Sequence, residues 1–164
     1  MALTLINTAA INKYVSPRDP GYSKKGSHKV DATVFHLGAM DSFIDAHIKS
    51  ICIDYSLKEG ISQSDLVDMS EEEAANATTF KVDTNLMAIE TVKYCLKGWD
   101  NLKDHNGNDV EFKTKKTQVK GRMYDALDTD ILSMLPAELI QELYVEINKG
   151  LTLTEEQAKN SDKG

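Results

Sequence analysis

The sequence is poor in the residues that form cross-links, rigid loops and membrane spans. Its 164 residues include two cysteines, three prolines and one tryptophan, and no apolar run approaches the ~20 residues that cross a bilayer. Cys52 and Cys95 lack CxxC spacing, so we expect two buried thiols. The opening residues lack the basic start and long apolar stretch of a secretory signal, so we expect a reducing cytoplasm and no membrane partner.

Basic residues are also outnumbered. The chain has 19 of them against 26 acidic residues, which gives a net charge of −7. Affinity for nucleic acid rests mostly on cations that meet phosphates, so nucleic acid is not expected as the main partner. The length and an apolar fraction of 41% suit one domain with its own hydrophobic core.

Motifs that carry chemistry are missing as well. The chain contains neither the GxSxG of serine hydrolases nor the phosphate-binding GxxxxGK[ST]. Its four histidines lack metal-ligand spacing. The stretch 104–115 resembles a calcium loop, but its glycine is fourth instead of sixth and its twelfth residue is lysine, so a hairpin turn explains the letters. We therefore expect no metal, no cofactor and no enzymatic activity.

Apolar residues at helical spacing predict two helices in the middle of the chain. The first begins after Asp41 as N-cap and carries its apolar stripe to Tyr55. The second spans 84–97, is capped by Asp83 or Thr84, and closes on Gly98 in a left-handed conformation.

Three more helices are predicted towards the C-terminus. Asp128 caps a short one, and Pro136 begins another that spans 136–149 and closes at Gly150. A capping box at 153–157 begins the last.

The strands are predicted from alternation and turn signals. We expect strands at 31–38, 79–84 and 110–114, and a further one around 118–124. Asn106-Gly107 is expected to form the tight turn of this β region.

The elements together predict an α+β fold, in which a small antiparallel sheet or hairpin packs with four to five helices. Residues 1–30 are expected to form an extended N-terminal arm, and 31–160 a single domain. An acidic connector lies near 60–78, where Ser70 begins a capping box for a short exposed helix. Residues 161–164 should fray.

Two groups of side chains are candidates for protein interaction. Trp99 and Tyr94 lie at the end of the 84–97 helix, either as an interface anchor or as core residues at a helix–hairpin junction. The one basic cluster is either an exposed charged hairpin or an electrostatic patch, which would bind an acidic partner protein or the chain's own 65–73 segment. Its residues are Lys113, Lys115, Lys116, Lys120 and Arg122. Tyr14 is a further candidate, because it could pin the arm onto a surface.

The stretch 80–160 resembles the tail assembly chaperones of tailed bacteriophages. The matching letters are VDTNLMAIETVKYCLKGWDNLKDHNGNDVEF, LSMLPAELIQELYVEINKG and LTEEQAKN. The resemblance implies a non-enzymatic protein that coats the tape-measure protein and delivers tail-tube subunits. It implies phage structural or assembly proteins as partners, self-association, and a place in the host cytoplasm during assembly.

Two alternatives remain open at this stage. One is a structural component of the virion, such as a neck, connector, tail or minor capsid protein. The other is a small enzyme whose site is too dispersed to be recognised in the sequence.

Overall fold

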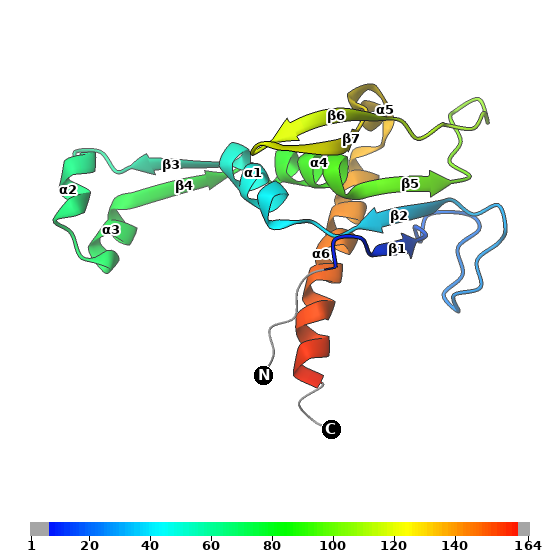
Figure 1. Ribbon diagram of the computed structural model, residues 1–164, viewed down its shortest axis with the longest axis horizontal. Coiled ribbons are helices and arrows are strands. Elements are labelled where there is room, and N and C mark those ends of the chain that lie inside the picture. Colours follow the sequence, from blue (N-terminus) through cyan, green and yellow to red (C-terminus); the bar gives the residue numbers. More distant parts are fainter. Residues whose placement is uncertain (1–6, 161–164) are drawn as a thin grey trace.

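A three-stranded antiparallel sheet lies at the centre of the protein's body. The computed structural model describes residues 7–160, with side chains up to Gly150. β2 (Val34–Gly38) is the middle strand, between β1 (Ile11–Tyr14) and β5 (Leu96–Asp100) (Figure 1). Two separate hairpins accompany this sheet. One pairs β3 (Ile53–Leu57) with β4 (Thr78–Val82), and the other pairs β6 (Thr114–Val119) with β7 (Arg122–Leu127).

Six helices complete the described part of the chain, and the expected α+β fold is confirmed. They are α1 (Ser42–Cys52), α2 (Gln63–Val67), α3 (Glu71–Ala77), α4 (Thr84–Cys95), α5 (Thr129–Met134) and α6 (Ala137–Asn160). The predicted N-caps are confirmed: the carboxylates of Asp41, Asp83 and Asp128 each accept a backbone N–H of the following turn. No helix in the described residues is both long and apolar enough to cross a membrane.

The core lies around α4, which packs against α1, α6, β5 and β7, while α6 also contacts β2. Each helix buries one face, but the predicted apolar stripes are wider than these faces: Ile51 of α1 is exposed and Ile89 of α4 is only half-buried. The buried residues include Phe35, Leu37, Ile44, Ile48, Ala88, Val92, Leu127, Leu143 and Ile147. Residues 11–21 contact this body: β1 pairs with β2, Val15 and Ser16 are buried, and the Asp19 carboxylate accepts the N–H groups of Gly21 and Thr33. Residues 24–31 form a largely exposed loop.

Two predicted helix ends are wrong, because each helix passes straight into a strand. α1 stops at Cys52 and Ile53 is already extended, so Tyr55 lies in β3 and not on a helical stripe. α4 stops at Cys95, and Gly98 lies inside β5 opposite His36. A Cβ on Gly98 would lie 3.2 Å from the His36 ring, so this glycine makes room for a cross-strand neighbour and does not cap the helix.

The β region after the sheet also differs from the prediction. Residues 110–112 form no strand: the Asn106-Gly107 turn closes a short loop, with a single bridge between Lys103 and Asp109. The hairpin forms further on, and its turn falls at Lys120-Gly121, in the middle of the predicted strand 118–124. Both turn residues have positive φ, 49° and 79°, as a two-residue hairpin turn requires.

The C-terminal helices are fused. α6 continues through Gly150 to Asn160, where two separate helices were predicted. A glycine inside a helix costs only about 1 kcal/mol relative to alanine, so Gly150 does not force an end. The side chains of the 153–157 capping box and residues 161–164 lie outside the described residues.

Candidate functional site

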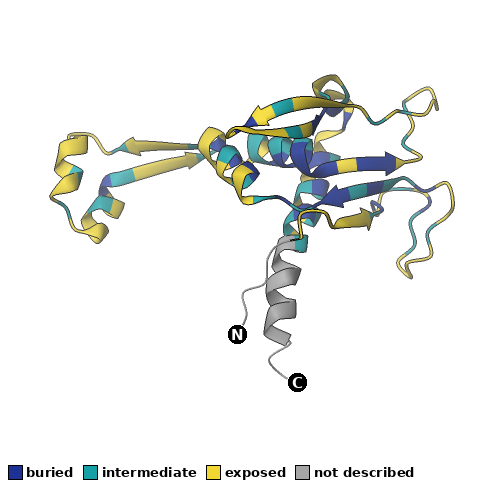
Figure 2. Ribbon diagram, viewed as in Figure 1, coloured by how far each residue is buried: buried dark blue, intermediate teal, exposed yellow. Residues whose placement is uncertain are grey.

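A two-stranded ribbon projects from the body and is the most exposed part of the described chain. We call residues Ile53–Val82 the projecting ribbon: β3, the α2–α3 tip and β4. β3 continues α1 without a break, and β4 leads through Asp83 into α4 (Figure 1). Asp83 N–H donates to the Cys52 carbonyl at 2.8 Å and closes the base. Ala77 is its only buried residue, and Figure 2 shows most of its length as exposed.

The register gives the ribbon one apolar and one polar face. Because directly paired residues of antiparallel strands share a face, Ile53 with Val82, Tyr55 with Phe80, and Leu57 with Thr78 form the apolar face. The polar face holds the pairs Asp54–Lys81 and Ser56–Thr79, and the two hydroxyls of the latter lie 2.7 Å apart. The outer residues of this face, Ile53, Val82, Leu57 and Thr78, are half-buried, and its central pair is exposed.

The aromatic pair at the centre of the apolar face is open to solvent. Tyr55 is 72% exposed and Phe80 is 69% exposed. A two-stranded hairpin is at best marginally stable in water, and clustered exposed apolar side chains mark protein interaction sites. The apolar face of the projecting ribbon is therefore the candidate docking surface.

The tip of the ribbon is acidic and ordered by two capping boxes. At α3, Ser70 Oγ accepts the Glu73 N–H at 3.3 Å while the Glu73 carboxylate accepts the Ser70 N–H at 2.9 Å, which confirms the predicted box. Ser62 and Asp65 form the equivalent box at α2. Hydrogen bonds from these serines lower the pKa of Asp65 and of Glu73. The carboxylates therefore stay ionised, and the ribbon's seven acidic and two basic residues give it a net charge of −5.

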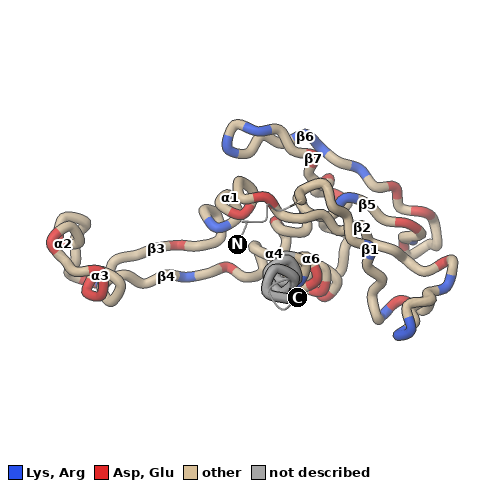
Figure 3. Tube along the Cα trace, turned by 60° about the horizontal axis from the view of Figure 1, so that its bottom comes forward, with Lys and Arg blue, Asp and Glu red and all other residues tan. Residues whose placement is uncertain are grey.

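The predicted basic cluster comes together on the β6–β7 hairpin. Residues 113–122 contain five cations and no acid. Lys113 pairs with Glu111 at 3.3 Å, Lys115 with Asp128 at 2.9 Å, and Lys116 with Asp125 at 2.8 Å. Figure 3 shows the basic residues at this hairpin and the acidic residues at the ribbon tip as separate groups. We call residues 113–122 the basic hairpin.

Trp99 and Tyr94 lie in the core, so neither ring is available as a surface anchor. Trp99 is 9% and Tyr94 is 4% exposed. The Trp99 indole N–H donates to the Val110 carbonyl at 2.6 Å, and Phe112 packs edge-on against the ring with centroids 4.9 Å apart. The interface-anchor alternative thus fails because the loop that follows β5 covers the indole.

Tyr14 fastens β1 to the long C-terminal helix. Its hydroxyl donates to Glu142 on α6 at 2.6 Å. Burial raises the pKa of Tyr14 above its usual 10, and the hydrogen bond to Glu142 raises it further. This hydrogen bond holds β1 against α6, and a role of Tyr14 in protein interaction stays a prediction.

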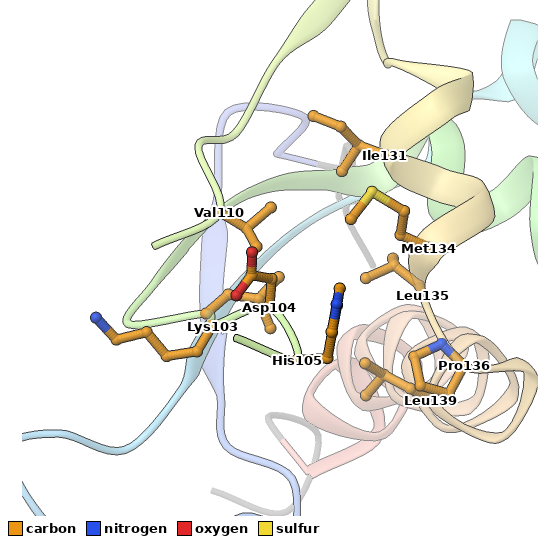
Figure 4. A pocket seen from close by; sticks show the side chains of 10 residues that line it. Lys103, Asp104, His105, Val110, Ile131, Met134, Leu135, Pro136 and Leu139 are labelled. Carbon is orange, nitrogen blue, oxygen red and sulfur yellow. The ribbon is translucent and has the colours of Figure 1, made fainter. Parts of the chain in front are cut away.

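An apolar cavity of about 590 Å³ opens between the 102–110 loop and the α5–α6 junction. Val110, Ile131, Leu135 and Leu139 are among its lining residues, and Lys103, Asp104 and His105 belong to its loop side (Figure 4). Lys103 points away from the cavity, whereas the His105 ring lies towards the apolar wall. The Asp104 carboxylate accepts the N–H groups of Asn106 and Asn108, which lower its pKa and tie it to its own turn.

Cysteine, histidine and carboxylate groups do not converge into a metal site within the described residues. Both thiols are buried and unpaired with each other, and burial raises the pKa of Cys95 to about 12. His36 lies 2.9 Å from the Asp100 carboxylate across the β2–β5 pair, and the Ser23 N–H donates to His28. These contacts brace strands and turns.

The exposed Tyr55–Phe80 pair is the part of the candidate docking surface that sequence reasoning missed. The sequence predicts an acidic connector near 60–78 and places Tyr55 on the stripe of the preceding helix. The signal was present in the alternation of Ile53, Tyr55 and Leu57, and in Phe80 and Val82 two residues apart. Only the pairing of the two segments identifies their shared face.

Comparison with known proteins finds no matching family model, no matching curated protein and no matching solved structure.

Proposed function

We propose that this chain is a non-enzymatic assembly protein of a tailed phage, which acts as a tail assembly chaperone by binding other proteins through its projecting ribbon. The exposed Tyr55–Phe80 pair is the observation that carries this proposal. A chain that keeps two large aromatic rings in water on a thin ribbon gains stability when a partner covers them. The resemblance of residues 80–160 to tail assembly chaperones supplies the biological setting.

The polar face of the same ribbon makes a matched genetic test possible. In the phage that encodes this chain, Tyr55→Ser/Phe80→Ser should lower the yield of infectious particles and leave tailless heads in electron micrographs. Asp54→Asn/Lys81→Gln changes the opposite face of the same strands and should leave the yield near wild type. Equal yields from the two double variants would remove the ribbon from the assembly role.

Mass spectrometry of purified particles separates an assembly factor from a virion component. An assembly chaperone is made in infected cells and is absent from mature particles. Stoichiometric amounts of the chain in particles, measured against the major tail protein, would overturn the chaperone proposal in favour of a structural component.

A further inference from the structure

We propose that the projecting ribbon docks on a second copy of this chain, antiparallel to the ribbon of that copy. In this arrangement the two apolar faces meet, and the acidic tip of each ribbon reaches the basic hairpin of the other copy. The inference rests on the proposed role of the ribbon as a protein contact, and it names the partner.

The apolar face is suited to self-association because it is its own complement. A two-fold axis brings the same patch of both copies together. Tyr55 and Phe80 of one ribbon then cover the same pair of the other, and aromatic rings gain beyond their area when they pack edge-to-face or offset. Both rings, at 72% and 69% exposure, have most of their surface to contribute.

The charge distribution favours a second copy of this chain as the partner of the ribbon. The ribbon carries −5 of the chain's net −7, while the basic hairpin carries +5. The tip acids take part in no ion pair among the described side chains, and the same holds for Lys120 at the hairpin turn. The ion pairs of Lys113, Lys115 and Lys116 have lysine side chains at least 63% exposed, so solvent screens each pair and the lysine can exchange its partner.

The position of the basic hairpin fits this arrangement. Arg122 beside the turn stacks over Phe43 of α1 at 4.8 Å, and the Tyr124 hydroxyl donates to Asp41, the N-cap of α1. Because α1 runs directly into β3, the hairpin turn lies on the side of the body from which the ribbon leaves (Figures 1 and 3). Two antiparallel ribbons place each tip beside the other's base. The tip–hairpin contact then forms twice, the two apolar faces meet once at the two-fold axis, and the assembly closes as a dimer.

Sedimentation velocity and light scattering of the purified full chain measure the mass directly. We expect twice the chain mass of 18.2 kDa at low salt, with dissociation favoured as salt rises, because exposed charge pairs are screened. Tyr55→Ser/Phe80→Ser should weaken the dimer at least about tenfold, as loss of central aromatic contacts does. Asp54→Asn/Lys81→Gln, on the polar face, should not.

A charge exchange between two variants tests the pairing of tip with hairpin. Glu71→Lys/Glu72→Lys reverses two charges at the tip and takes the ribbon from −5 to −1. Lys116→Glu/Lys120→Asp reverses two charges of the basic hairpin and takes it from +5 to +1, and aspartate suits the left-handed turn position. Each variant alone should dimerise at least about tenfold more weakly than wild type, because the reversed side chains then face like charges. An equimolar mixture should recover the dimer, because the reversed side chains of one variant then face those of the other, which are of opposite charge.

The mixture separates a lost contact from a lost fold, because two misfolded chains would not restore each other. A wild-type chain that stays monomeric at its highest soluble concentration would overturn the proposal. So would a mixture that stays as monomeric as its components. Either result could occur while the phage experiment still shows that the ribbon is needed, and the ribbon's partner would then be a different protein.

Discussion

The indole nitrogen of Trp99 lies 2.6 Å from the carbonyl oxygen of Val110 and donates a hydrogen bond to it. This bond joins β5 to the loop that follows it and packs against the indole. It uses the one polar atom of the side chain inside the body, so the ring is held by packing and by a directional contact at once.

Replacement of Trp99 should therefore damage stability. We expect Trp99→Ala to lower the free energy of unfolding by ~3–5 kcal/mol, because a large buried side chain is lost. Trp99→Phe should cost ~1–3 kcal/mol, because the Val110 carbonyl is left without its donor. Urea titration followed by far-ultraviolet circular dichroism measures both. A cost below about 1 kcal/mol for Trp99→Ala would mean that the ring is not part of the core.

Thr91 offers a gain in stability. Its hydroxyl is buried in α4 and has no hydrogen-bond partner among the described residues. Thr91→Val removes the unpaired polar group and keeps the β-branched shape, so the free energy of unfolding should rise by ~1 kcal/mol. Thr84→Val, at an exposed site on the same helix, should stay within about 0.5 kcal/mol of wild type. If Thr91→Val is less stable than Thr84→Val, the Thr91 hydroxyl of the wild-type chain has a hydrogen-bond partner in solution.

The body should fold without the projecting ribbon. Residues 55–80 can be replaced by Asn-Gly, because Asp54 and Lys81 are paired and a two-residue turn joins such positions. The ribbon buries only Ala77, so the melting temperature should change by less than about 4 °C, equivalent to ~1 kcal/mol in a chain of this size. Scanning calorimetry measures this. Loss of a cooperative transition would show instead that the body depends on the ribbon.

Tyr14 should make the protein sensitive to alkali. Burial and then the hydrogen bond to Glu142 raise the pKa of Tyr14 in the folded state above the value near 10 in the unfolded chain. The folded state therefore holds its proton longer, so this contribution is complete below pH ~10 and is lost as the pH rises further. Tyr14→Phe should cost ~0.5–1.5 kcal/mol at pH 7.

The alkaline test compares slopes between the two chains. Above pH ~10 the unfolding free energy of wild type should fall more steeply than that of Tyr14→Phe, while the difference between them stays constant from pH 7 to 9. Parallel curves throughout would mean that Tyr14 titrates alike in both states.

Local signals predicted the helices well, because each helix carries its own cap and apolar stripe. The carboxylates of Asp41 and Asp128 and the Ser70–Glu73 box act within one turn of chain, so neighbouring letters suffice to find them. The helix ends at Cys52 and Cys95 were missed because no glycine or proline follows at once. Strand pairing with distant residues decides where these helices stop.

Of the candidate site, likewise, the part made by residues that are neighbours in sequence could be predicted, and the part made by distant residues could not. The basic cluster could be predicted, since its lysines are neighbours in sequence and stay neighbours in the hairpin. The Tyr55–Phe80 face could not, because it depends on the register between segments that the acidic tip separates. A register shift of one residue would have placed the polar side chains on that face instead.

Because α1 passes directly into β3 and β4 directly into α4, the number of residues in the two strands determines how far the tip lies from the body. Its two strands leave the body from one closed base, at the hydrogen bond between Asp83 and Cys52. Each residue pair added between base and tip would move the tip outward by about 3.4 Å without altering the core. In the proposed dimer, the length of the ribbon would set the spacing between the two bodies, and inserting or deleting residue pairs would change that spacing.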